Sequence, residues 1–151
     1  MDENQSPPRN RMAIAILSLA GLFVAAYLLA HSLGLTGPLV CGIGECDTVQ
    51  SSKWSHVGPI PVSAFGVVGY LALVATSLFG LQPAGRASRP VGVLLLSLAA
   101  VALACSAWLT YLEAFVIRAW CQWCVISAIL VTCIFLAALP ELKRLRARSD
   151  A

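Results

Sequence analysis

This sequence has few charged residues. Only 11% of its 151 residues are Asp, Glu, Lys or Arg, whereas a soluble domain carries about 25%. Hydrophobic residues make up 59% of the chain, and the mean hydropathy is +0.83. A soluble core of this size would not bury so much apolar surface. The composition therefore predicts a protein whose solvent is largely lipid, and the length predicts one domain.

The sequence also lacks a basic arm or face of the kind that binds nucleic acid. Its net charge is only +3, and its Lys and Arg residues are not gathered anywhere except in the C-terminal tail. We therefore expect no nucleic-acid partner. The sequence also contains no motif typical of haem, flavin or nicotinamide binding.

Four uncharged apolar runs are long enough to cross a membrane as helices. They cover residues 12–35, 61–81, 91–112 and 121–139, and Pro140 closes the last of them. A helix as long as the first run rises roughly 35 Å, enough to cross a hydrocarbon core of ~30 Å. That run exceeds the ~7–15 residues of a signal-peptide core, and no small-x-small cleavage site follows it. The predicted fold is an all-α integral membrane bundle of four transmembrane helices.

The distribution of Lys and Arg predicts the orientation. With four spans, the tails 1–11 and 140–151 share one side with the 82–90 loop. That side carries eight of the ten Lys and Arg residues. Both termini are therefore expected in the cytoplasm of a bacterial cell, below its inner membrane. The 36–60 loop and the 113–120 turn then face outward.

The 36–60 loop is the only sizeable segment predicted outside the membrane. Its middle, residues 47–55, is expected to form a short cap helix, with Asp47 as the N-cap because a carboxylate accepts from free backbone N–H groups. Trp54 is expected either to anchor this cap at the lipid interface or to cover a bound ligand.

Six cysteines require an explanation in a membrane chain. Cys41 and Cys46 lie in the outer loop. Cys121 and Cys124 form C-Q-W-C at the outer start of the fourth span, so both pairs meet the oxidising side of a bacterial membrane. Two thiols three residues apart at a helix start share one face and can close a disulfide. The free N–H groups there also stabilise a thiolate.

Three interpretations of these two pairs stay open. They are a four-thiolate zinc site, a set of structural disulfides and a redox relay. The relay is favoured, because thiol–disulfide exchange can carry electrons from the exposed outer pair to the pair at the membrane boundary. The terminal acceptor must take two electrons within the membrane, and a quinone is suited to this.

Five other residues are expected to have no part in the chemistry. Cys105 and Cys133, within the spans, are expected to be small apolar core residues. Glu113, at the outer end of the third span, is expected to be solvated. His31 and His56 lack a clear partner and are expected to be structural.

Three stretches of the sequence follow one another in a recognisable order. C-D-T-V-Q-S-S-K-W over residues 46–54 matches a Cys-x-x-Val-x-x-Ser-(Lys/Arg)-Trp pattern. G-P-I-P-V-S-A-F-G follows over residues 58–66, with Tyr70 beyond it, and C-Q-W-C-V-I-S over residues 121–127 completes the set. In this combination the chain resembles the vitamin K epoxide reductase family in its bacterial form, from about residue 35 to residue 139.

The resemblance implies a four-helix bundle around a quinone, either ubiquinone or menaquinone, capped by the short helix of the loop. It implies that Cys124 attacks or donates to the quinone ring and that Cys121 resolves it by pairing with Cys46. Cys41 would exchange with the protein substrate. Ser52 matches a family serine that supports the cysteine shuttle or the quinone pocket.

The chain departs from the family at two positions. Some members carry an Asn near the start of the second span and a Tyr just after C-x-x-C, both binding quinone oxygens, where this chain has Val62 and Ala128. Ser63 and Ser127 are the nearby polar candidates for that contact. The remaining predicted quinone-site residues are Ser52, Trp54 and Phe65.

The sequence as a whole predicts a thiol:quinone oxidoreductase that forms disulfides. Its substrate would be a thioredoxin-like periplasmic protein. Many bacterial relatives carry such a domain fused, but this chain ends at Ala151, so the partner is expected in trans. One alternative is a quinone or quinone-epoxide reductase whose product is the reduced quinone. The other is a membrane metal-binding or transport protein that uses Cys thiolates.

Overall fold

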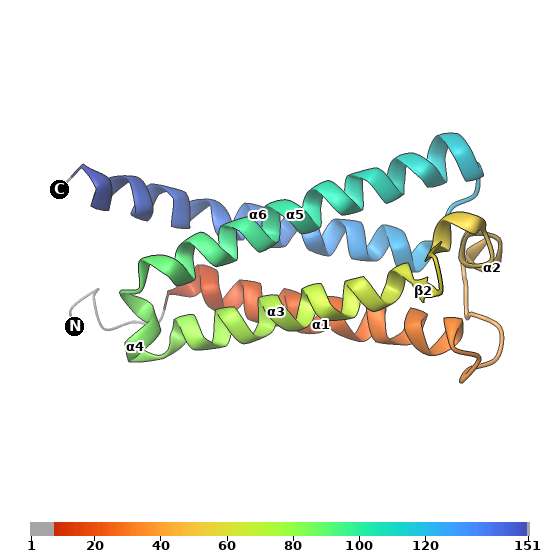
Figure 1. Ribbon diagram of the computed structural model, residues 1–151, viewed down its shortest axis with the longest axis horizontal. Helices are drawn as coiled ribbons and strands as arrows, with labels where there is room; N and C mark the ends of the chain where they lie inside the picture. The colour runs from red at the N-terminus through yellow and green to blue at the C-terminus, as the bar shows by residue number, and fades with distance from the viewer. Residues whose placement is uncertain (1–7, 151) are drawn as a thin grey trace.

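Four long helices run side by side in the computed structural model, which describes residues 8–150 (Figure 1). They are α1 (Arg9–Ser32), α3 (Val62–Leu81), α5 (Arg89–Tyr111) and α6 (Gln122–Ser149). Each is long and apolar enough to cross a membrane. These helices confirm the predicted all-α four-helix bundle. A helix suits such apolar segments because it satisfies the backbone polar groups internally, which lipid requires. Residues 1–7 of the predicted N-terminal tail lie outside the described residues.

Short elements gather at the two ends of the bundle. At one end lie α2 (Cys46–Gln50), the 3-10 turn η1 (Lys53–Ser55) and an antiparallel pair of strands, β1 (His56–Val57) and β2 (Ile60–Pro61). On the same end, α5 continues as the π-helical turn η2 (Leu112–Ile117). At the opposite end, α4 (Pro83–Arg86) connects α3 to α5 (Figure 1). The start of α1 and the end of α6 lie at that end too.

Two helix ends differ from the prediction. The cap helix α2 begins at Cys46 after Glu45, so Asp47 lies in its first turn and is not the N-cap. Its carboxylate lies 3.5 Å from the His31 ring instead, which gives that histidine a partner that the sequence did not suggest. Pro140 does not end the fourth helix, which continues to Ser149. An interior proline costs a hydrogen bond, but the segment after it is held in place at Glu141.

A buried ion pair closes the α4 end of the bundle. The side chains of Arg11 and Glu141 are 2.9 Å apart and only 3% and 2% exposed. Arg11 also donates to the carbonyl groups of Gly80 and Gly85. A buried pair is tolerated when hydrogen bonds satisfy its remaining polar atoms, and these bonds join α1, α6 and the α3–α4 junction.

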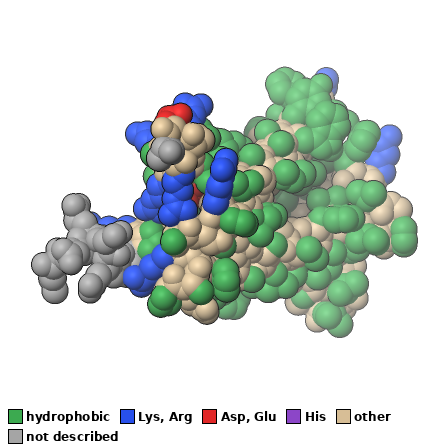
Figure 2. Space-filling view, turned by 60° about the vertical axis from the view of Figure 1, so that its left-hand side comes forward, with side chains coloured by type: hydrophobic (Ala, Val, Ile, Leu, Met, Phe, Trp, Pro, Cys, Tyr) green, Lys and Arg blue, Asp and Glu red, His purple; other side chains and the backbone are tan. Residues whose placement is uncertain are grey.

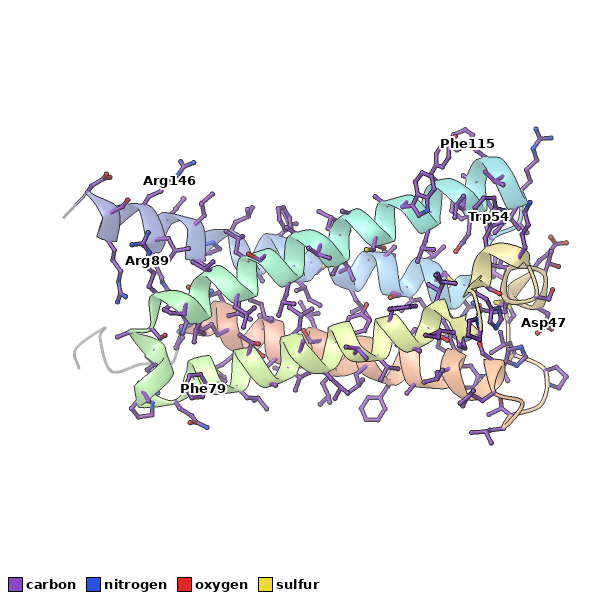
Figure 3. The ribbon with its side chains drawn as sticks, viewed as in Figure 1. Asp47, Trp54, Phe79, Arg89, Phe115 and Arg146 are labelled. Atoms are coloured by element: carbon purple, nitrogen blue, oxygen red, sulfur yellow. A yellow bond between two sulfur atoms is a disulfide. The ribbon has the colours of Figure 1, made fainter. Side chains whose placement is uncertain are left out.

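The outer surface is that of a bundle in lipid. Apolar side chains cover its flank, and Lys and Arg side chains gather at the α4 end (Figure 2). Arg89 and Arg146 lie toward that end, whereas Trp54 lies at the other (Figure 3). Cys105 and Cys133 are exposed on the bundle. Their prediction as packed core residues is therefore wrong: Cys105 lines an open space between the helices, and the bundle leaves Cys133 uncovered.

Candidate active site at the cysteine end

The two predicted cysteine pairs lie together at the α2 end of the bundle. Cys41 and Cys46 form a disulfide, whereas Cys121 and Cys124 are free thiols. Cys46 is 1% exposed and Cys121 is 0% exposed, and both belong to one hydrophobic cluster. The partly buried Cys41 and Cys124 pack against the same cluster. The fold thus gathers the four residues that sequence reasoning selected for the relay.

Backbone contacts hold the loop of the outer disulfide against the C-Q-W-C segment. The N–H of Glu45 donates to the carbonyl oxygen of Trp120 at 2.7 Å, and Gly44 forms a β-bridge with Cys121. Gly44 has a φ of +100°, and a Cβ there would lie 2.4 Å from the Trp120 oxygen. Only glycine permits this close approach of two backbones.

The two middle residues of C-Q-W-C hold the same loop through their side chains. The Gln122 side-chain oxygen accepts from the N–H groups of Gly42 and Ile43 at 2.9 and 3.0 Å. Trp123 Nε1 donates to the carbonyl oxygen of Val40 at 2.9 Å. Sequence reasoning missed both roles, because no local pattern links residues in the outer loop to those at the start of α6.

Cys121 is poised to ionise. It occupies the N-cap position of α6. A hydrogen bond with the Cys124 side chain lowers the pKa of Cys121 from 9.0 to about 7, in opposition to burial, which raises it. The backbone N–H groups of Cys124 and Trp123 act in the same direction as that hydrogen bond, because a helix start offers unpaired donors. The amide of Gln50 lies beside both sulfurs, 3.6 Å from that of Cys124.

Glu113 is buried and contacts both cysteines of the inner pair. It is 4% exposed, its Oε2 accepts from the Cys121 N–H at 3.2 Å, and its side chain is hydrogen-bonded to that of Cys124. The prediction of a solvated side chain is wrong, because η2 extends the third helix and carries this residue. At Arg118 the backbone adopts a φ of +58° and leaves the helix toward Cys121. π-Helical turns frequently occur at functional sites.

A cavity of about 410 Å³ lies beside Cys124, between the four long helices and the cap. Its wall is mostly apolar, and Cys124 is the one member of the two pairs that lines it within the described chain. Every predicted quinone-site residue lies on this wall: Ser52, Trp54, Ser63, Phe65 and Ser127. Cavities of this size and character are typical of small-molecule sites.

Few polar groups line the cavity. The Ser63 hydroxyl is buried and has no hydrogen-bond partner among residues 8–150. A buried unpaired hydroxyl costs about 1–3 kcal/mol, so it marks a place where a ligand oxygen would be stabilised. The hydroxyl of Tyr70 lies 2.7 Å from that of Ser127, and both residues line the wall. Of the two departures from the family, Val62 lines the cavity and Ala128 does not.

The donor set does not suit a metal ion. Across residues 8–150, no three His, Cys, Asp or Glu side chains are grouped so as to hold one. The disulfide occupies two of the four thiols that a zinc site would need as thiolates. The arrangement favours redox chemistry at the cysteines. The cavity, with its unpaired hydroxyl, fits a quinone head group.

Comparison with known families agrees with this geometry. The model of the vitamin K epoxide reductase family matches residues 12–139, a range that contains both cysteine pairs and the cavity. Members of that family are oxidoreductases, and their thiol chemistry is linked to quinones. This multi-pass membrane protein belongs to the vitamin K epoxide reductase family.

Proposed function

We propose that this protein is a thiol:quinone oxidoreductase that forms disulfide bonds. It would oxidise a thioredoxin-like protein and reduce a membrane quinone, either ubiquinone or menaquinone. One observation carries the proposal: an outer disulfide, an inner dithiol and an apolar cavity adjoin at one end of the bundle. Cys46 packs in the cluster of Cys121, and Cys124 reaches the cavity wall.

The greater exposure of Cys41 supports it as the cysteine that meets the partner. Cys41 is partly buried, whereas Cys46 is 1% exposed. The flanking Val40 and Ile43 are 75% and 83% exposed, an apolar surface on which a partner can dock. A thiolate of the partner attacks Cys41, and the sulfur of Cys46 leaves with the electron pair. The partner's second thiol then releases Cys41 and closes the partner's own disulfide.

The electrons then move inward by exchange. The Cys46 thiolate attacks Cys121 of an inner disulfide, and the Cys124 sulfur leaves as a thiolate. Attack by Cys41 on Cys46 restores the outer disulfide and frees Cys121. The end point is an oxidised outer pair and a reduced inner pair, the arrangement found in this structure.

The reduced inner pair faces the cavity through Cys124. A bound quinone accepts two electrons and two protons, and Cys121 and Cys124 close their disulfide as it does so. The Ser63 hydroxyl, which has no partner among residues 8–150, would donate to a quinone oxygen, and the Tyr70–Ser127 pair would offer a second donor. Trp54, on the cap, also lines the cavity.

The proposed location is a bacterial inner membrane, with the cysteine end outside and the α4 end in the cytoplasm. The gathering of Lys and Arg at the α4 end supports it (Figure 2). In this orientation the tails 1–11 and 140–151 are cytoplasmic, and residues 12–139 form the membrane domain. The thioredoxin-like partner would reach the disulfide from the periplasm.

The test follows quinone reduction by absorbance with the purified protein in detergent and a reduced thioredoxin-like protein as the donor. Wild type is compared with Cys124→Ala. Cys105→Ala is the matched control, because Cys105 lines the same cavity and belongs to neither pair. We expect turnover in wild type and the control and none in Cys124→Ala. Full turnover in Cys124→Ala would refute the relay. A folded wild type that reduces none of several quinones would refute the function.

A further inference from the structure

The chain buries two glutamates at opposite ends of the bundle, and their surroundings differ. Glu141 is held by the guanidinium of Arg11 through two hydrogen bonds, at 2.9 Å each. Glu113 is 4% exposed, and no Lys, Arg or His in residues 8–150 forms an ion pair with it. Its partners are the backbone N–H of Cys121 and the side chain of Cys124. A buried carboxyl without a cation is costly unless its charge can be neutralised.

The neighbours of Glu113 are the groups whose protons must move in the proposed reaction. Two negative charges in contact, without a cation between them, disfavour one another. The Glu113 carboxyl and the Cys124 thiol therefore hold one proton between them, and only one of the two groups is ionised at a time. Ionisation of the Cys124 thiol is therefore coupled to protonation of Glu113. Glu113 also lines the cavity, so the same carboxyl faces both the thiol and the space for the quinone.

We infer that Glu113 is the catalytic acid–base residue that carries the proton of the Cys124 thiol to the quinone, an inference that rests on the proposed function. The Glu113 carboxylate takes this proton as the Cys124 sulfur gives up its electrons, and the Cys121 thiolate closes the S–S bond. The Glu113 acid then gives the proton to a quinone oxygen. The second proton is the one Cys121 released, and it returns from water at the outer face. One disulfide and one quinol result, with two electrons and two protons transferred.

The variant Glu113→Gln isolates this role. Glutamine keeps the size of the side chain and an oxygen that accepts from the Cys121 N–H, but it does not accept a proton. Glu45→Gln is the matched control, because Glu45 is exposed in the outer loop directly before Cys46. Each protein is reduced with dithiothreitol, freed of reductant and mixed with a short-chain ubiquinone in detergent. The first phase of the loss of quinone absorbance, in which the inner pair is oxidised, gives the rate of the last step.

A second readout separates proton transfer from a structural role. The oxidised proteins are reduced with dithiothreitol without quinone, and thiol formation is followed by gel shift after alkylation. We expect Glu113→Gln to slow quinone reduction by roughly 10²- to 10⁴-fold, the usual contribution of a general acid–base. Its reduction by dithiothreitol should stay near the wild-type rate, and Glu45→Gln should match wild type in both.

The outcomes are distinguishable. A wild-type rate of quinone reduction in Glu113→Gln overturns the inference and leaves the proposed function standing. Equal slowing of both reactions also overturns it, since a structural acceptor would act on both. Failure of wild type itself overturns the proposed function and the inference with it. If Glu113→Gln does not fold, Glu113→Asp and Glu113→Asn repeat the comparison. Glu113→Asp must then reduce quinone at least about tenfold faster than Glu113→Asn, and equal rates overturn the inference.

Discussion

Substitution of Gly44 by alanine is expected to separate the two cysteine pairs without altering a cysteine. The backbone there has a φ of +100°, and the added Cβ would lie 2.4 Å from the carbonyl oxygen of Trp120. The conformation alone costs about 1–3 kcal/mol for a residue with a side chain. If the loop moves away to relieve the contact, the hydrogen bond from Glu45 to Trp120 is lost, at about 0.5–1.5 kcal/mol.

The two contributions together amount to roughly 1.5–4.5 kcal/mol, which shifts the docked loop toward undocked conformations by roughly 10- to 2,000-fold. The assay is formation of the Cys46–Cys121 disulfide in a background of Cys41→Ser and Cys124→Ser, with a mild oxidant and a non-reducing gel. The rate of the cross-link depends on the population in which the loop lies against α6. We expect Gly44→Ala to form it at least about tenfold more slowly than the parent.

Gly58→Ala is the control for backbone strain. Gly58 lies in the same outer segment with a φ of +62°, but a Cβ there would meet nothing within 4 Å. It should therefore carry only the cost of the left-handed conformation, about 1–2 kcal/mol, and cross-link close to the parental rate. Equal rates in the two alanine variants would refute the reasoning, because the approach of the loop to Trp120 would then not control exchange.

Three further outcomes follow from other parts of the molecule. Ser63→Ala should raise the KM for quinone about tenfold without lowering the thermal unfolding temperature, because its hydroxyl has no protein partner among the described residues; an unchanged KM would contradict this. Glu141→Leu leaves Arg11 buried without its carboxylate. It should cost about 3–5 kcal/mol in thermal unfolding, which Arg11→Met in the same chain should largely restore. In the reduced inner pair, ultraviolet absorbance should report a thiolate that is half-formed near pH 7, the lowered pKa of Cys121. That thiolate should be present above this pH, lost below it, and absent in Cys121→Ser.

The helices and the cysteine end were predictable for physical reasons. An uncharged apolar run of the length of residues 12–35 has one stable use, a membrane helix, so the fold followed from composition. The C-Q-W-C segment fell at the start of such a run, which placed Cys121 where a helix N-terminus favours a thiolate. The resemblance added Ser52 and the start of α3, and Ser52, Ser63 and Ser127 line the cavity.

Other features depend on packing that the sequence does not encode locally. The spans are apolar on nearly all faces, so no periodicity distinguished the packed core from the cavity wall, where Cys105 lies, or from the exposed surface, where Cys133 lies. Pro140 is a helix breaker by itself, yet the residue after it is fixed by Arg11 on another helix. The side chain of Gln122 binds a loop that is distant in the sequence, and no sequence motif predicts such a contact.

The contrast between the two ends of the bundle argues for where the chemistry lies. At the α4 end, a guanidinium bonds both oxygens of the Glu141 carboxylate, and a carboxylate fixed in this way gains nothing by taking up a proton. At the cysteine end, Glu113 is buried against a thiol and a backbone N–H, and Ser63 keeps an unpaired hydroxyl. Folding alone would favour their replacement by apolar residues. Polar groups left incompletely satisfied beside a cavity are what a site needs if its partners arrive with the substrate.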